Sequence, residues 1–123
     1  MTRKEFEALV QDTYNISADY PFEGDFETGV FRHTDNGKWF GIAMNIPRKK
    51  LGALSEDNID VVNLKCAPEV IESIVGVEQG IYPAYHMNKT HWITLSLGEI
   101  TDVDLLSWLL NISYDLTKKK IRK

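Results

Sequence analysis

The chain has 123 residues, of which 43% are hydrophobic and 26% are charged, so it is long enough for one domain with a real core and too short for two. Its formal net charge of −4 disfavours indiscriminate binding to nucleic acid, which depends on neutralising phosphates. A single cysteine, Cys66, excludes an internal disulfide, and no apolar run is long enough to cross a bilayer. We therefore expect residues 1–123 to form one globular domain.

The chain opens with a helix signal. Thr2 followed by Glu5 has the spacing of a capping box, and apolar residues then recur at helical intervals at Phe6, Leu9, Val10 and Tyr14. This pattern predicts a helix over residues 3–14, followed by a loop over residues 17–25. The first ten residues carry charges and lack the apolar core of a signal peptide, so we expect a cytoplasmic protein.

Two strands of one hairpin are predicted next, over residues 26–33 and 38–46. Asp35-Asn36-Gly37 lies between them and supplies residues that tolerate the positive φ of a tight turn. Alternation in the second strand predicts one shared face for Phe40, Ile42, Met44 and Ile46. A basic turn, Arg48-Lys49-Lys50, ends this strand.

The second half of the chain completes an α+β pattern. Residues 59–66 are rich in β-branched side chains and predict a third strand, and Pro68 opens a short helix that Gly76 ends. Residues 93–97 alternate between apolar and polar side chains, which is typical of a half-buried strand. Thr101 or Asp102 caps a long final helix. This order predicts a mainly antiparallel sheet with the N- and C-terminal helices packed on one face.

The densest group of aromatic, basic and amide side chains precedes that last strand. It contains Tyr82, Tyr85, His86, Asn88, Lys89, His91 and Trp92. Pro83 and the Asn88-Lys89-Thr90 run predict a turn, so these polar groups are expected at one end of the sheet. They indicate a binding surface; the alternative is that the rings complete the core of a small domain.

Five blocks give the chain a family resemblance. They are GKWFG at 37–41, NLKCAPE at 63–69, PAYHMNK at 83–89, HWI at 91–93 and SYDL at 113–116. In this order, over nearly the whole chain, they resemble the MmcQ/YjbR family, although the family usually has Lys-x-Phe-Ala where this chain has Lys38-Trp39-Phe40-Gly41. The resemblance implies a CyaY-like (frataxin-like) fold, with two helices against an antiparallel sheet. It also implies DNA binding through hairpins arranged as a double wing.

The leading expectation is therefore a non-enzymatic DNA-binding protein. Lysine and arginine would contact phosphates, and aromatic rings would stack on bases. The candidate contact residues are Arg48, Lys49, Lys50, Lys65, Tyr85, His86, Asn88, Lys89, His91 and Trp92. We interpret the basic tail from Lys118 to Lys123 as solvated and complementary to the dipole of the last helix.

Other functions remain as alternatives. The same aromatic and basic groups could form a pocket for a small molecule or a protein partner. Weak metal binding by an acidic face would use Glu5, Glu7, Asp12, Asp25 and Glu27. A Cys66 nucleophile would need His86 or His91 within hydrogen-bond reach, whereas a lone cysteine ending an apolar strand usually packs in the core. We expect no catalytic residue, no cofactor, no metal site, no membrane partner and a monomeric state.

Overall fold

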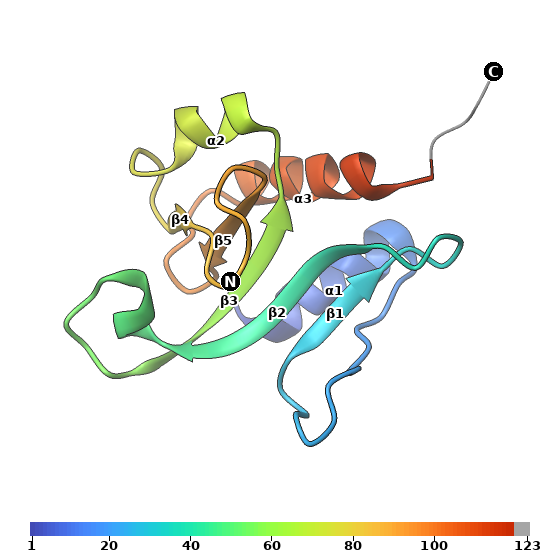
Figure 1. Ribbon diagram of the computed structural model, residues 1–123, viewed down its shortest axis with the longest axis horizontal. Helices are drawn as coiled ribbons and strands as arrows, with labels where there is room; N and C mark the ends of the chain where they lie inside the picture. The colour runs from blue at the N-terminus through green and yellow to red at the C-terminus, as the bar shows by residue number, and fades with distance from the viewer. Residues whose placement is uncertain (120–123) are drawn as a thin grey trace.

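The computed structural model describes residues 1–119, which form three α-helices, one short 3-10 helix and a five-stranded sheet (Figure 1). In chain order these are α1 (Arg3–Tyr14), β1 (Gly29–Arg32), β2 (Trp39–Pro47), η1 (Arg48–Leu51), β3 (Asn58–Lys65), α2 (Pro68–Ile74), β4 (Ile81–Pro83), β5 (Trp92–Ser96) and α3 (Val103–Thr117). The strands lie in the order β1-β2-β3-β5-β4, and every neighbouring pair is antiparallel. The predicted α+β class is confirmed.

The two terminal helices, α1 and α3, lie together behind the sheet in the view of Figure 1. Ala43, Val62 and Leu95 are paired in register across three neighbouring strands, and all three belong to the buried core beneath these helices. Apolar residues from α1 and α3 close the same core, among them Phe6 and Leu109. The sheet therefore has a helix-covered face and a second, open face that is free to carry a site.

Both terminal helices begin with side-chain caps. The Thr2 hydroxyl accepts a hydrogen bond from the Glu5 amide, and the Glu5 carboxylate accepts one from the Thr2 amide, so the predicted capping box is confirmed. Asp102 caps α3 by accepting a hydrogen bond of 2.9 Å from the Leu105 amide. Each cap satisfies amides that have no partner inside the helix.

The first strand is shorter than predicted. The Asp25 carboxylate accepts hydrogen bonds from the amides of Glu27 and Thr28, both at 2.9 Å. This local turn uses backbone donors that a longer strand would give to the sheet. Phe26, which was predicted to lie in the strand, is 86% exposed in the loop instead.

The predicted face of Phe40 is wrong because the first hairpin contains a β-bulge. Arg32 pairs with Trp39 and Phe31 pairs with Gly41, which leaves Phe40 as an extra residue on β2. Its ring turns toward the helices and packs in the core. Its carbonyl accepts a hydrogen bond of 2.6 Å from the buried Ser113 hydroxyl of α3. The bulge thus joins the hairpin to the last helix.

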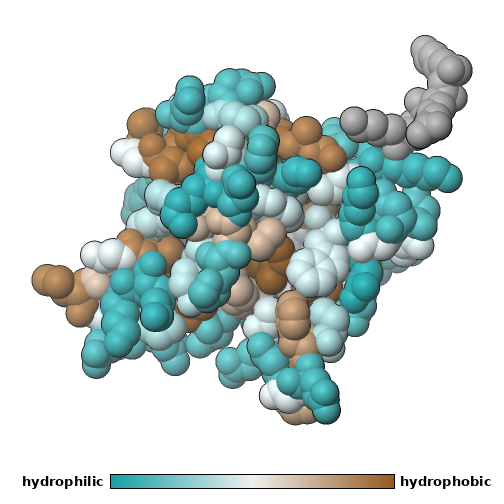
Figure 2. Space-filling view, viewed as in Figure 1, coloured by the Kyte–Doolittle hydropathy of each residue, from teal (hydrophilic) through white to brown (hydrophobic). Residues whose placement is uncertain are grey.

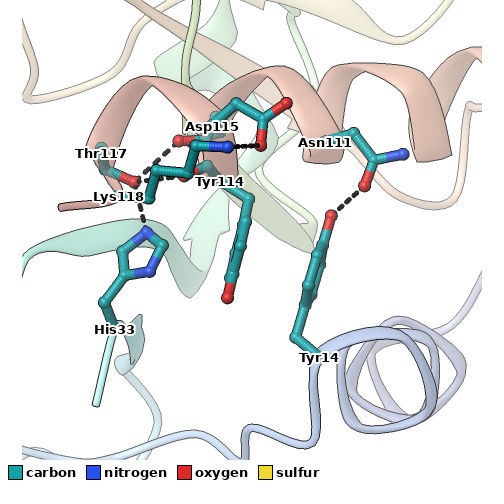
Figure 3. Close-up of polar contacts among 8 residues, drawn as sticks. Tyr14, His33, Asn111, Tyr114, Asp115, Thr117 and Lys118 are labelled. Carbon is teal, nitrogen blue, oxygen red and sulfur yellow. Dashed lines mark hydrogen bonds and ion pairs between the residues drawn. The ribbon is translucent and has the colours of Figure 1, made fainter. Parts of the chain in front are cut away.

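A buried histidine holds the end of α3 against the same hairpin (Figure 3). His33 is only 4% exposed, and its Nε2 lies 2.8 Å from the Thr117 hydroxyl oxygen. The Thr117 hydroxyl donates its proton to the Ser113 carbonyl, so His33 Nε2 must be the donor to Thr117. The Tyr14 and Tyr114 rings stack beside His33 with their centroids 4.0 Å apart. Burial lowers the pKa of His33.

We expect the protein to lose stability as the pH falls from about 7.5 to about 5.5, because unfolded His33 takes up a proton in that range more readily than the buried ring. Urea denaturation at the two pH values measures the change in the free energy of unfolding. His33→Gln should flatten this dependence, while His91→Gln, at an exposed position, should leave it as it is. Equal pH dependence in His33→Gln and the native protein would contradict this role.

Two further features concern the ends of elements. None of the helices within residues 1–119 combines the length and the apolar content that crossing a membrane requires. Most of the predicted basic tail, residues 120–123, lies outside the described residues. Lys118, at its start, places its Nζ 3.3 Å from the Asp115 carboxylate, in a pair exposed to solvent.

Candidate functional site

The basic turn and the aromatic stretch, which are far apart in the sequence, meet in one pocket of about 360 Å³. One side comes from the end of η1, and the other comes from β4 and the loop that follows it. The lining residues are Lys50, Leu51, Tyr82, Pro83, Ala84, Tyr85, His86 and Lys89. The pocket therefore combines two lysines with three aromatic or imidazole rings.

The position of the basic turn follows from local backbone chemistry. β2 ends at Pro47, and the next four residues wind into η1, which Gly52 ends with a φ of 92°. Glycine adopts this left-handed conformation without the steric cost that a side chain adds. The Arg48 amide donates a 2.7 Å hydrogen bond to the Asp57 carbonyl, which closes the connection to β3. Lys50 is thereby fixed at the end of a hairpin.

The three basic residues of the turn have different environments. The Arg48 guanidinium lies 2.9 Å from one oxygen of the Glu99 carboxylate, and the Tyr82 hydroxyl donates a 2.6 Å hydrogen bond to the other oxygen. This hydrogen bond raises the pKa of Tyr82, so the phenol stays protonated. Lys49 lies 3.5 Å from Glu56 at the surface. Lys50 has no ion pair within residues 1–119, which leaves its ammonium available to a ligand.

A closed ring of hydrogen bonds fixes Tyr85 to the open face of the sheet. The Tyr85 amide donates to the Thr94 hydroxyl at 2.8 Å, and Asn63 donates its side-chain amide to the Tyr85 carbonyl at 2.8 Å. The Thr94 hydroxyl donates in turn to the Asn63 side-chain oxygen at 2.5 Å. Asn63 and Thr94 are cross-strand partners on β3 and β5 and are almost fully buried. Every polar group of this ring is satisfied.

The loop after Tyr85 bends sharply. His86 has a φ of 62°, a left-handed conformation that is uncommon for residues with a side chain. Its ring centroid lies 3.9 Å from that of Tyr85, with the two planes tilted by 46°. The Asn88 side chain accepts a 2.8 Å hydrogen bond from the Thr90 amide, so Asn88 stabilises the turn. The loop crosses in front of β3 and β5 in Figure 1.

The ten residues proposed from the sequence fall into three groups. Four line the pocket: Lys50, Tyr85, His86 and Lys89. Three take part in contacts within the protein, which are described above: Arg48, Lys49 and Asn88. The last three, Lys65, His91 and Trp92, lie near the far end of β3 from η1, where Lys65 and Trp92 are cross-strand partners and the His91 carbonyl accepts a hydrogen bond from the Cys66 amide.

Sequence reasoning missed the residues that support the pocket. Glu99 lies beyond the aromatic stretch and gave no motif, although its carboxylate holds Arg48 and Tyr82. Asn63 and Thr94 had a usable signal, since each is a polar residue inside an otherwise apolar strand. A buried polar side chain in a strand needs a partner, and here that partner is the loop that carries the site.

The two alternative chemistries gain little from the structure. Cys66 is 1% exposed, and burial raises the pKa of its thiol, so the reactive thiolate is disfavoured. Within residues 1–119, no three histidine, cysteine, aspartate or glutamate side chains are grouped closely enough to hold a metal ion together. The proposed acidic-face residues Glu5 and Asp25 instead hydrogen-bond to nearby backbone amides.

Comparison with known proteins places the chain in a family. The YjbR family profile matches residues 11–116. The uncharacterised protein YyaQ of Bacillus subtilis is 38% identical over 118 residues, which are 96% of this chain and 99% of YyaQ. A crystal structure of a Pseudomonas syringae protein has a TM-score of 0.91 and 40% identity and covers 96% of this chain and 100% of that one.

A more distant solved structure, from Deinococcus radiodurans, has a TM-score of 0.72 and 28% identity, covering 99% of this chain and 83% of that one. The relatives therefore match both the sequence and the arrangement of helices and strands over almost the full chain. The family indicated by the sequence blocks is confirmed: this chain belongs to the YjbR family, which is the MmcQ/YjbR family.

Proposed function

We propose that the protein binds DNA without catalysing a reaction and that the open face of the sheet around the pocket is the contact surface. The observation that supports this most directly is the meeting of Lys50 with Tyr85, His86 and Lys89 in one pocket. Two lysine ammonium groups can neutralise phosphates, and the rings offer flat surfaces to bases. The CyaY-like class and a cytoplasmic location, which the sequence led us to expect, belong to the same proposal.

The charge of the protein sets the expected strength of binding. A net charge of −4 repels a polyanion, so local phosphate contacts have to overcome a repulsive background. Phosphate contacts also provide no base sequence preference. We therefore expect weak binding with little sequence preference that strengthens as the salt concentration is lowered.

The second candidate is a small-molecule site at the same place. The pocket volume of about 360 Å³ falls near the lower end of the range of about 300–1,000 Å³ that is typical of ligand sites. Hydrophobic side chains form separate patches on the face shown in Figure 2 rather than one broad apolar area. This surface favours a ligand with both polar and flat apolar parts over a wholly apolar one.

Fluorescence anisotropy of labelled single- and double-stranded DNA at two salt concentrations tests the proposal. We expect saturable binding whose logarithmic salt slope falls by about 1 for each lysine removed in Lys50→Ala and Lys89→Ala. Lys4→Ala, on an exposed position of α1 on the other side of the sheet, is the matched control and should bind as the native protein does. An absence of binding to either DNA at low salt would rule the proposal out.

A further inference from the structure

The shape of the pocket restricts what part of a nucleic acid can enter it. In a duplex both faces of every base are covered by stacked neighbours, so an aromatic side chain reaches a base face only where the base is unpaired or flipped out. Tyr85 and His86 line a concave pocket rather than a flat ridge. Such a pocket suits a single nucleotide unit better than a stretch of double helix.

The charges around the pocket favour a phosphate at its edge. Lys50 approaches from η1 and Lys89 from the loop after β4, so cations stand on two sides. The nearest acidic group in the neighbouring hydrogen-bond network, Glu99, has one oxygen held by Arg48 and the other by the Tyr82 hydroxyl. These contacts compensate its negative charge. A phosphate bound by the lysines therefore meets less repulsion than a free carboxylate would impose.

The remaining lining is suited to a base. Leu51, Pro83 and Ala84 contribute apolar surface, and the Tyr85 and His86 rings lie in contact with each other. The hydrogen-bond ring holds both the amide and the carbonyl of Tyr85, so this aromatic wall exists before a ligand arrives. A preformed wall lowers the entropy that binding has to overcome.

We propose that this pocket binds one nucleoside 5′-monophosphate unit, with the phosphate between Lys50 and Lys89 and the base against the Tyr85–His86 pair. The proposal rests on the proposed DNA binding in that the unit would be an unpaired nucleotide of a strand. It goes further because it predicts that the free mononucleotide binds by itself.

Titration of the ¹⁵N-labelled protein with thymidine 5′-monophosphate, followed by two-dimensional NMR, tests this. We expect saturable shifts centred on the amides of Lys50 and of the loop from Tyr85 to Lys89. Thymidine, which lacks the phosphate, and inorganic phosphate, which lacks the base, should each bind about tenfold more weakly, because either loses one of the two contact types. Equal affinity for inorganic phosphate and the mononucleotide would overturn the base contact.

Variants separate the two halves of the site. Tyr85→Leu should weaken mononucleotide binding about tenfold and leave the affinity for inorganic phosphate unchanged. Lys89→Ala should weaken both ligands, and Lys4→Ala should weaken neither. If Tyr85→Leu binds the mononucleotide as the native protein does while its spectrum shows a folded protein, the proposed base position is wrong.

The outcomes also separate this inference from DNA binding itself. Mononucleotide binding without binding to any oligonucleotide would support the pocket and overturn the DNA-binding proposal. Salt-sensitive binding of duplex DNA that depends on Lys89, without mononucleotide shifts, would support DNA binding and overturn the pocket assignment.

Discussion

Replacing Thr94 with valine should destabilise the protein by about 3 kcal/mol, because two buried polar groups lose their partner at about 1–3 kcal/mol each. Valine has nearly the shape of threonine but no hydroxyl. The Tyr85 amide then has no acceptor, and the Asn63 side-chain oxygen has no donor. Urea denaturation of Thr94→Val and the native protein measures the difference.

The same substitution should loosen the site more than the rest of the fold. Thr94 is fully buried on the open face, and its hydroxyl forms the link between β5 and the loop that starts at Tyr85. Without that link the loop keeps only the Asn63 contact at this point. Hydrogen exchange at the amides of Tyr85 and His86 should therefore accelerate more than exchange at β2 or β3.

Thr94→Ser is the matched control, because it keeps the hydroxyl and removes only a methyl group. It should retain the slow exchange of the loop amides and recover most of the lost stability. Equally slow exchange at Tyr85 in Thr94→Val would show that other contacts hold the loop, and the hydrogen-bond ring would then have no special role in shaping the pocket.

This ring shows what a sequence can and cannot predict. The alternation of residues 93–97 predicted a strand with one buried face, and the structure has a strand over Trp92–Ser96. The pattern treated Thr94 as solvent-facing, yet it is 0% exposed. Alternation reports which residues share a face, whereas the loop folded over that face is a tertiary feature that local pattern does not encode.

The candidate site was predictable by composition and not by assembly. The group from Tyr82 to Trp92 stood out in the sequence, and so did the Arg48-Lys49-Lys50 turn. Their meeting depends on a strand order in which β5 pairs with β3 and β4 pairs with β5. Residues that share a motif were accordingly separated: Lys89 lines the pocket, while Trp92 lies across from Lys65.

Helices were predicted better than strand faces for a physical reason. The capping box at Thr2 and the cap at Asp102 are local hydrogen bonds, so the sequence defines them directly. The face of Phe40 depends on a bulge opposite Phe31 and Arg32, where one extra residue reverses the alternation. No residue near position 40 marks that bulge by itself.

Replacing Gly80 with alanine should destabilise the protein by about 3 kcal/mol, the sum of a left-handed backbone cost of about 1–2 kcal/mol and a packing clash of similar size. Gly80 has a φ of 86°. A Cβ there would lie 2.7 Å from Ile100 Cγ1 and 3.2 Å from the Ile100 backbone nitrogen. Ile100 is buried in the core, so neither it nor its backbone can move aside cheaply.

Gly76→Ala is the matched control for the backbone cost alone. Gly76 has a φ of 81°, and a Cβ there would meet no atom within 4 Å, so its replacement should cost only about 1–2 kcal/mol. Urea denaturation of both variants gives the two free energies of unfolding. Equal costs would mean that Ile100 gives way. A larger cost for Gly80→Ala would show that the close approach before β4, where the Gly80 carbonyl accepts a hydrogen bond from the Ser96 amide, fixes the strand that carries Tyr82 into the pocket.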